Sequence, residues 1–262
     1  MKIFLTIVLV FLSIVSLLSE LDNSALKIYD ETFDRAIYSF ALAKGLNAVI
    51  SVLQSSEVNL SFFVGATIGI GQILDPINDL VERFSIIMLV ASISLGVQHL
   101  LLIMSKSIFL KILLMLFASL SIFLIWMKKF QTSNALKLSM KLVLVLLVLR
   151  FGAVLFIYSN ELLYNEVYAG EYHTSKDFIN GYKSNLESLQ QDQKRLATSL
   201  SKLESKSETF SNKVIKLITI FVVTTILFPL LFVWLFIFVI KLIYNKEVDY
   251  AIILGLNQKE IK

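Results

Sequence analysis

The fold class of this 262-residue chain is decided by residues 182–241, YKSNLESLQQDQKRLATSLSKLESKSETFSNKVIKLITIFVVTTILFPLLFVWLFIFVIK. The first half carries apolar residues in a 4-3 spacing that only Gln193 and Ser207 interrupt. The second half, residues 217–240, has 24 residues without a charge. A heptad seam that leads directly into such a segment is typical of a membrane-anchored coiled coil. The stretch therefore predicts one continuous helix, with its first half in water and its second half in lipid.

The apolar residues of the seam share one face of this helix. They are Tyr182, Leu186, Leu189, Leu196, Leu200, Leu203, Phe210, Val214 and Leu217. An amphipathic helix has to bury such a stripe. A second copy of the chain, residues 159–180 or a helical partner protein would each bury it. We therefore expect residues 182–213 to mediate homo-oligomerisation or partner binding.

The composition of the whole chain is that of a membrane protein. Hydrophobic residues make up 56 % and charged residues 17 %, and the mean hydropathy is +0.77. The net charge of +4 is dispersed, so the chain lacks the basic stripe of a nucleic-acid-binding protein. It has no cysteine, which excludes disulfides, iron–sulfur clusters and thiolate zinc sites. Its two histidines are 74 positions apart, so we expect neither a metal site nor a cofactor.

Four further runs are predominantly apolar and long enough to be considered as membrane spans. They are residues 3–19, 84–105, 108–127, which has Lys111 near its start, and 142–158, which has one charged residue at its centre. The first run follows Lys2 and lacks the small-residue pattern of a cleavage site. We therefore expect it to be a retained anchor and not a cleaved signal peptide. With residues 217–240, the sequence predicts five spans.

Residues 20–83 differ from these spans because they contain nine acidic and four basic residues. Apolar and small polar residues alternate over residues 58–71, which predicts a β-hairpin with its turn near Gly65. Asp75 followed by Pro76 is typical of the start of a helix. We therefore expect residues 20–83 to form a small α+β unit beside the membrane.

The predicted fold class is mainly α: a polytopic helical membrane protein with a small α+β extramembrane unit and a coiled-coil arm. The predicted parts are an anchor (1–19), the α+β unit (20–83), a transmembrane hairpin (84–127), a basic loop (128–141), a transmembrane helix (142–158), the coiled-coil arm (159–213), a last transmembrane helix (214–245) and a tail (246–262).

Lysines on both sides of the predicted spans give conflicting orientations. Residues 128–141 contain four lysines and no acid, which places this loop in the cytoplasm and the arm on the non-cytoplasmic side. Lys2 also favours a cytoplasmic N-terminus, but the number of predicted crossings between the two is then odd. An additional crossing near residues 58–74, a first or second segment that does not cross, or an N-terminus outside would each remove the conflict.

Arg150 is the most informative single residue because it lies in the middle of the fourth span, with eight uncharged residues on either side. An intramembrane guanidinium costs about 2.5 to more than 10 kcal/mol unless it meets a polar partner or water. The sequence favours an interhelical contact to Gln98, His99, Tyr158 or the acids of residues 75–82. The alternative is a solute path or anion site formed by Arg150, Gln98 and His99.

No Ser–His–Asp arrangement, metalloprotease motif, nucleophile elbow or phosphate loop occurs in the sequence, so we do not expect an enzyme. We expect a scaffold, signalling or assembly protein that acts through its coiled-coil arm. The alternative is a channel or transporter for a small solute or ion. The chain resembles bacterial polytopic membrane proteins only in general, which implies a location in the inner membrane.

Overall fold

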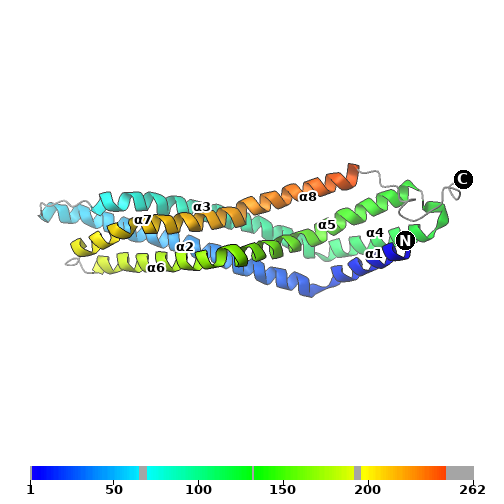
Figure 1. Cartoon of the computed structure of the whole chain (residues 1–262), viewed down its shortest axis with the longest axis horizontal. Helices are drawn as coiled ribbons and strands as arrows, with labels where there is room; N and C mark the ends of the chain where they lie inside the picture. Colours follow the sequence, from blue (N-terminus) through cyan, green and yellow to red (C-terminus); the bar gives the residue numbers. More distant parts are fainter. Residues whose placement is uncertain (1, 65–69, 132, 192–195, 246–262) are drawn as a thin grey trace. The chain divides into compact units, whose positions relative to one another are not determined.

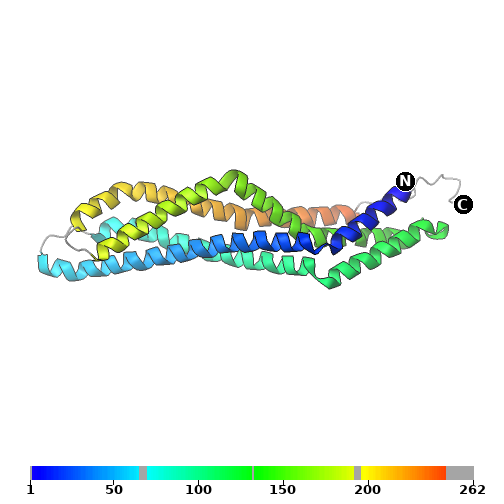
Figure 2. The same cartoon turned by 90° about the horizontal axis from the view of Figure 1, so that it is seen from below.

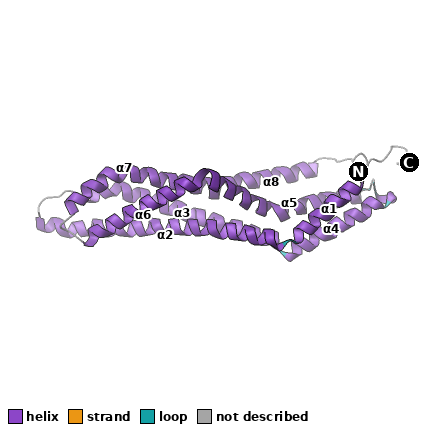
Figure 3. Ribbon diagram, turned by 60° about the horizontal axis from the view of Figure 1, so that its bottom comes forward, coloured by secondary structure: helices purple, strands orange, loops and turns teal. Residues whose placement is uncertain are grey.

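The computed structural model describes the backbone of residues 2–64, 70–131, 133–191 and 196–245, and the side chains of these ranges outside 56–73 and 189–204. Within these ranges every element is a helix (Figures 1 and 3). They are α1 (Lys2–Leu17), α2 (Ser19–Val64), α3 (Ile70–Lys106), α4 (Ile108–Trp126), a 3-10 turn (Lys128–Phe130), α5 (Asn134–Leu163), α6 (Ala169–Gln191), α7 (Leu196–Phe221) and α8 (Phe228–Asn245).

Two π-helical segments join consecutive helices without a break. Tyr164–Tyr168 lies between α5 and α6, and Val222–Leu227 lies between α7 and α8. Pro229, the second residue of α8, has no N–H, so one carbonyl of the preceding turn lacks its helical donor. The Thr225 carbonyl in this turn accepts a hydrogen bond from Ser94 Oγ.

Five helical stretches in the described part are long and apolar enough to cross a membrane, so the chain is an integral membrane protein. Four of them match the spans expected at 84–105, 108–127, 142–158 and 217–240, the second of which ends at Trp126. The fifth is not the predicted anchor. It is Ser19–Ser55, whereas the N-terminal run forms the shorter helix α1.

The prediction of a small α+β unit is wrong. Residues 58–64, expected as the first strand of a hairpin, continue α2, and α3 begins at Ile70. Gly65 and Gly69 lie outside the described residues. The alternation was misleading because Phe63 falls among its polar positions, so the two sets of residues are not cleanly separated into an apolar and a polar face. An isolated hairpin is also marginally stable, whereas each added helical residue extends an existing helix.

Pro76 does not mark the start of a helix as predicted. It is the seventh residue of α3, which begins at Ile70. An internal proline removes only one helical hydrogen bond. The neighbouring Asp75 accepts a hydrogen bond from Gln54 Nε2 of α2, at 2.9 Å, and this contact supports α3 beside the proline.

The chain divides into two compact units. Unit 1 comprises Met1–Tyr29, Val97–Ser159 and Pro229–Lys262. Its helices α1 and α4 pack side by side (Figures 1 and 3). Together with the first half of α5 they bury an apolar core. The core contains Leu9, Leu114, Ala118, Leu124, Ile125, Leu136, Met140, Val143 and Leu146.

Unit 2 comprises Asp30–Gly96 and Asn160–Phe228. Its helices α6 and α7 pack antiparallel, as Figure 2 shows in lime and yellow-orange. The Tyr182 and Phe210 rings lie 4.4 Å apart, and Glu171 accepts hydrogen bonds from Lys213 and Lys216 at 3.0 and 2.7 Å. The prediction of one continuous helix over residues 182–241 is therefore wrong. The described seam residues of α6 and α7 pack against each other within the chain, as a helical hairpin.

The described seam residues are buried in this hairpin. Tyr182, Leu186, Phe210, Val214 and Leu217 are all at most 2 % exposed. The side chains of the other seam residues, Leu189, Leu196, Leu200 and Leu203, lie outside the described part of the chain. The described part of the apolar stripe is therefore buried within the chain, and α6 includes residues 169–180, which belong to one of the three surfaces that the sequence allowed.

Candidate functional site

Arg150 is fully buried in unit 1 and pairs with Asp22 of α2. Its Nη1 donates to Asp22 Oδ1 at 2.8 Å and its Nη2 to Asp22 Oδ2 at 3.0 Å. The backbone carbonyl of Ser16 accepts two more hydrogen bonds, from Nε at 3.2 Å and Nη2 at 2.9 Å. Every nitrogen of the guanidinium therefore donates to an oxygen of the same chain.

Two further residues complete this Arg150 cluster, which consists of Ser16, Asp22, Ser105, Lys111 and Arg150. Lys111 Nζ donates to Asp22 Oδ2 at 2.8 Å, and Ser105 Oγ donates to the Arg150 carbonyl. These residues come from the end of α1, the start of α2, the end of α3 and the start of α4, with Arg150 inside α5. The cluster therefore holds together the α1–α2 and α3–α4 connections.

The electrostatics of the cluster explain why a buried arginine is tolerated. The last carbonyls of an α-helix lack helical donors and carry the negative end of its dipole. Ser16, the penultimate residue of α1, presents such a carbonyl to Arg150. Two cations share one carboxylate, and this carbonyl offsets part of the excess positive charge. Pairing and hydrogen bonding of this kind offset much of the desolvation cost of the buried charges.

The structure pairs Arg150 with a carboxylate that the sequence did not indicate. His99 stacks on Tyr29, with ring centroids 4.7 Å apart and an interplanar angle of 9°. Gln98 is buried beside an apolar groove of unit 1. Asp22 was missed because it stands 128 positions from Arg150, in a segment whose many charges marked it as aqueous. The only local signal was its place three residues after the uncharged run 3–19.

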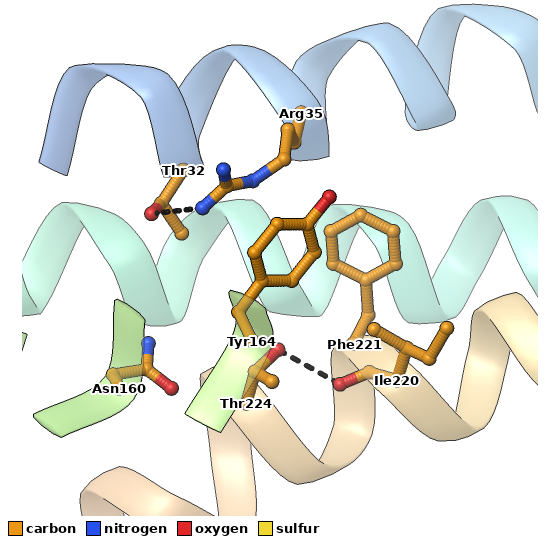
Figure 4. Close-up of a pocket in the computed structure, with 7 residues that line it drawn as sticks. All are labelled: Thr32, Arg35, Asn160, Tyr164, Ile220, Phe221 and Thr224. Carbon is orange, nitrogen blue, oxygen red and sulfur yellow. Dashed lines mark hydrogen bonds between the residues drawn. The ribbon is translucent and has the colours of Figure 1, made fainter. Parts of the chain in front are cut away.

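A second ion pair lies in unit 2, between α2 and α5. Arg35 Nη2 donates to Glu161 Oε2 and to Thr32 Oγ1, both at 2.8 Å. The Arg35 guanidinium carbon lies 3.8 Å from the centroid of the Tyr164 ring, a close cation–π contact (Figure 4). Sequence reasoning missed this site because its partners are 126 positions apart and neither lies in an uncharged run.

A small cavity of about 10 Å³ adjoins this pair, lined by Asn160, Tyr164 and Thr224 among others (Figure 4). This is about the space that one water needs. Among the described atoms, Asn160 Oδ1 and the Tyr164 hydroxyl have no hydrogen-bond partner. Both π-helical segments border the cavity, since Tyr164 begins one and Thr224 belongs to the other. Such wide turns recur at functional sites.

Neither cluster is a metal site or a nucleophile–base arrangement. The described residues contain no group of three or more His, Asp or Glu side chains that would hold a metal ion. Arg150 and Arg35 each meet a carboxylate, and such pairs hold helices together.

Comparisons of the chain with protein-family models, with curated proteins and with solved structures found no match. The functional proposal therefore rests on the geometry of the two units.

Proposed function

We propose that the chain is a multi-pass membrane protein of scaffold, signalling or assembly type that acts through its helices α6 and α7. The observation that carries this proposal is that every guanidinium nitrogen of Arg150 donates a hydrogen bond to an oxygen of the same chain. Arg150 was the strongest sequence feature in favour of a solute path. A guanidinium that is engaged by Asp22 and Ser16 supports a structural role, which leaves the extramembrane helices as the functional part.

The orientation of the protein follows from the lysines of unit 1. Lys2 Nζ donates to Gln131 Oε1 at 3.1 Å, and Lys141 Nζ to the Tyr244 carbonyl at 2.7 Å. These bonds gather the N-terminus of α1, the loop after α4 and the end of α8 at one end of unit 1. The end also carries Trp126, a residue type enriched at membrane interfaces. By the positive-inside rule, this end is cytoplasmic.

In the proposed orientation, Lys2 and the lysine-rich loop 128–141 lie on the same side of the membrane. Helix α1 leaves the cytoplasm and α4 returns to it, provided that α2 and α3 either both cross the membrane or both do not. The Arg150 cluster supports this parity because it brings the α1–α2 and α3–α4 connections together. Helices α6 and α7 are then non-cytoplasmic, in a protein of the bacterial inner membrane.

The partner of α6 and α7 is a second copy of the chain or another helical protein. Their apolar positions Tyr182 and Phe210 are used within the hairpin, so the partner meets the outward polar positions. Asp177 and Glu187 are two of these, with side chains 72 % and 47 % exposed. Charged rim residues of this kind determine partner choice and association rate more than affinity.

The experiment is native mass spectrometry of the protein in lipid nanodiscs, with and without a candidate helical partner. We expect assemblies that the double variant Asp177→Lys/Glu187→Lys weakens. A matched control is Asp79→Lys, which reverses an equally exposed charge on α3. A wild-type protein that stays monomeric and binds no helical partner contradicts the proposal, as does an assembly that both variants leave unchanged.

A second candidate function, transport of an anionic solute, is favoured by the charge of the Arg150 cluster. Arg150 and Lys111 are two cations against the single carboxylate of Asp22. If this excess charge serves transport, Arg150→Leu abolishes flux of the solute in liposomes. Flux that is absent in the wild type or unchanged in the variant removes this function.

A further inference from the structure

Described side chains of α3, α4, α5 and α8 line an apolar groove in unit 1. Its volume is about 570 Å³, which is within the range of about 300–1,000 Å³ that small-molecule sites occupy. The wall is almost entirely aliphatic and aromatic. Representative lining residues are Met104, Phe109, Ala153, Phe232 and Phe236.

The rim of the groove is apolar and exposed. Met104 is 66 % exposed and Phe109 is 73 % exposed, although both belong to helices long and apolar enough to cross a membrane. Ser105, Ser107 and Gln98 supply the few polar groups of the wall. An open apolar groove of this kind is unfavourable in water, whereas a bilayer offers hydrocarbon to fill it.

We infer that the groove holds one acyl chain of a membrane phospholipid. The size of the groove distinguishes this occupant from a helix of a second copy. A helix with its side chains is about 10–12 Å wide, so about 570 Å³ contains only about one turn of it. A hydrocarbon chain is thin and flexible, and it makes only the dispersion and apolar contacts that such a wall offers.

The wall of the groove depends on a close helix contact beside Arg150. A Cβ atom at Gly152 of α5 would lie 1.8 Å from Phe236 Cζ of α8. The absent side chain therefore makes the space in which the Phe236 ring lies. Phe156 and Phe232, further along the same two helices, pack edge to face with centroids 5.2 Å apart. The rings of Phe156, Phe232 and Phe236 all line the groove, so these contacts form part of its wall.

The test uses a phosphatidylethanolamine that carries a diazirine on one acyl chain, incorporated into nanodiscs with the full-length protein. After irradiation, peptide mass spectrometry locates the label. We expect labelling concentrated on Met104, Phe109, Phe232 and Phe236. Labelling of lipid-facing residues outside the groove that is as strong as labelling within it would overturn the inference, because surrounding lipid alone produces that pattern.

A variant that fills the groove is compared with a matched control on the same helix. Ala153→Trp places an indole in the groove, whereas Leu155→Trp changes a residue of the same helix that is 60 % exposed and outside the groove. We expect labelling of the groove to fall about tenfold in the first variant, the factor for a loss of about 1.4 kcal/mol of binding free energy, and to stay unchanged in the second. Unchanged labelling in Ala153→Trp overturns the inference.

A second groove variant and a competition experiment with unlabelled lipid test the same inference if Ala153→Trp does not fold. Val233→Trp obstructs the groove from its rim and is expected to reduce labelling in the same way. Unlabelled phosphatidylethanolamine in excess should compete with the probe. Groove labelling that excess unlabelled lipid does not reduce would overturn the inference. If a chemical crosslinker instead joins groove residues of two copies of the chain, a second copy and not a lipid occupies the groove.

Discussion

Arg150 and Asp22, which lie 128 positions apart, form a bidentate ion pair with two N–O distances of 2.8 and 3.0 Å. The pair is fully desolvated, since both residues are almost completely buried. Buried ion pairs add little net stability over apolar residues, but the loss of one partner leaves an uncompensated charge. The pair therefore restricts which residues are allowed at either position more than it stabilises the fold.

The first prediction concerns the two single variants of this pair. Arg150→Leu should lower the free energy of unfolding by about 3–5 kcal/mol because Asp22 loses its main partner. Asp22→Asn should cost more, since both Arg150 and Lys111 then lose their only carboxylate within the cluster. Unfolding of the protein in detergent micelles, followed by circular dichroism, measures both effects.

The double variant Arg150→Leu/Asp22→Leu should lose less stability than the two single losses together, since it leaves only Lys111 unpaired. The control is Arg83→Leu, which removes an exposed partner of Asp79 and should change stability by about 0–1 kcal/mol. If Asp22→Asn is as stable as the wild type, the pair does not hold the helices together.

The second prediction distinguishes the α6–α7 hairpin from a continuous helix. The native chain has no cysteine, so a pair introduced as Tyr182→Cys/Phe210→Cys reports on this contact alone. We expect an intramolecular disulfide after mild oxidation, seen as a shift in non-reducing electrophoresis. In one continuous helix these positions would be about 42 Å apart, and no intramolecular bond would form. The pair Tyr182→Cys/Ile215→Cys, whose second position is exposed, is the control.

The third prediction concerns the sidedness of unit 1. Single cysteines at positions 2, 129 and 244 should all be labelled from the cytoplasmic side because hydrogen bonds join Lys2 to Gln131 and Lys141 to Tyr244 at the lysine-rich end. Cysteines at positions 23 and 106, near the Arg150 cluster, should not share this accessibility. Labelling of inside-out and right-side-out vesicles with a membrane-impermeant maleimide measures the pattern. Labelling of position 2 and position 129 from opposite sides would contradict the proposed orientation.

The fourth prediction is that Gly152→Ala destabilises unit 1. The added Cβ overlaps the Phe236 ring, and overpacking of this kind costs about 1–3 kcal/mol. The second-site change Phe236→Ala should restore part of the loss because it removes the overlapping ring. Gly96→Ala is the matched control, since no atom lies within 4 Å of the position of its Cβ. Thermal unfolding in micelles gives the order of the variants.

The fifth prediction separates the charge of Arg35 from its shape. Arg35→Lys keeps the charge but loses the planar guanidinium that stacks on Tyr164, which should cost about 1–2 kcal/mol. Tyr164→Phe keeps the aromatic face and removes a buried hydroxyl without a described partner, so it should be neutral or stabilising. A greater loss in Tyr164→Phe than in Arg35→Lys would show that the hydroxyl is bonded in the native protein.

Properties that depend on neighbouring residues were predictable from the sequence. The runs at 84–105, 108–127 and 217–240 are strongly apolar over a membrane thickness, with Lys111 as their one charged residue, and each lies mainly within helices of the structure. The importance of Arg150 was also evident, because a lone charge in an apolar run needs a partner. Its identity as Asp22 depends on how distant helices pack, and no local pattern carries that information.

The helical hairpin shows the same limit in a different way. The 4-3 spacing of residues 182–217 requires a partner surface, but it is equally compatible with another chain and with a neighbouring helix. Between residues 182 and 228 there is no proline or glycine to indicate where the chain reverses. The seam was therefore recognised as an apolar stripe, and residues 159–180 were among the three surfaces considered for it, but the sequence did not decide between them.

The two π-helical segments, Tyr164–Tyr168 and Val222–Leu227, have a consequence for how the length of the chain can vary. Each wide turn accommodates one residue more than a regular α-helix needs. Deletion of one residue there converts the turn to ordinary α-helix, and every later side chain keeps its direction. The same deletion elsewhere in α5 or α7 turns all later side chains by about 100°. Single-residue length differences are therefore tolerated at these two turns and harmful along the rest of the helices.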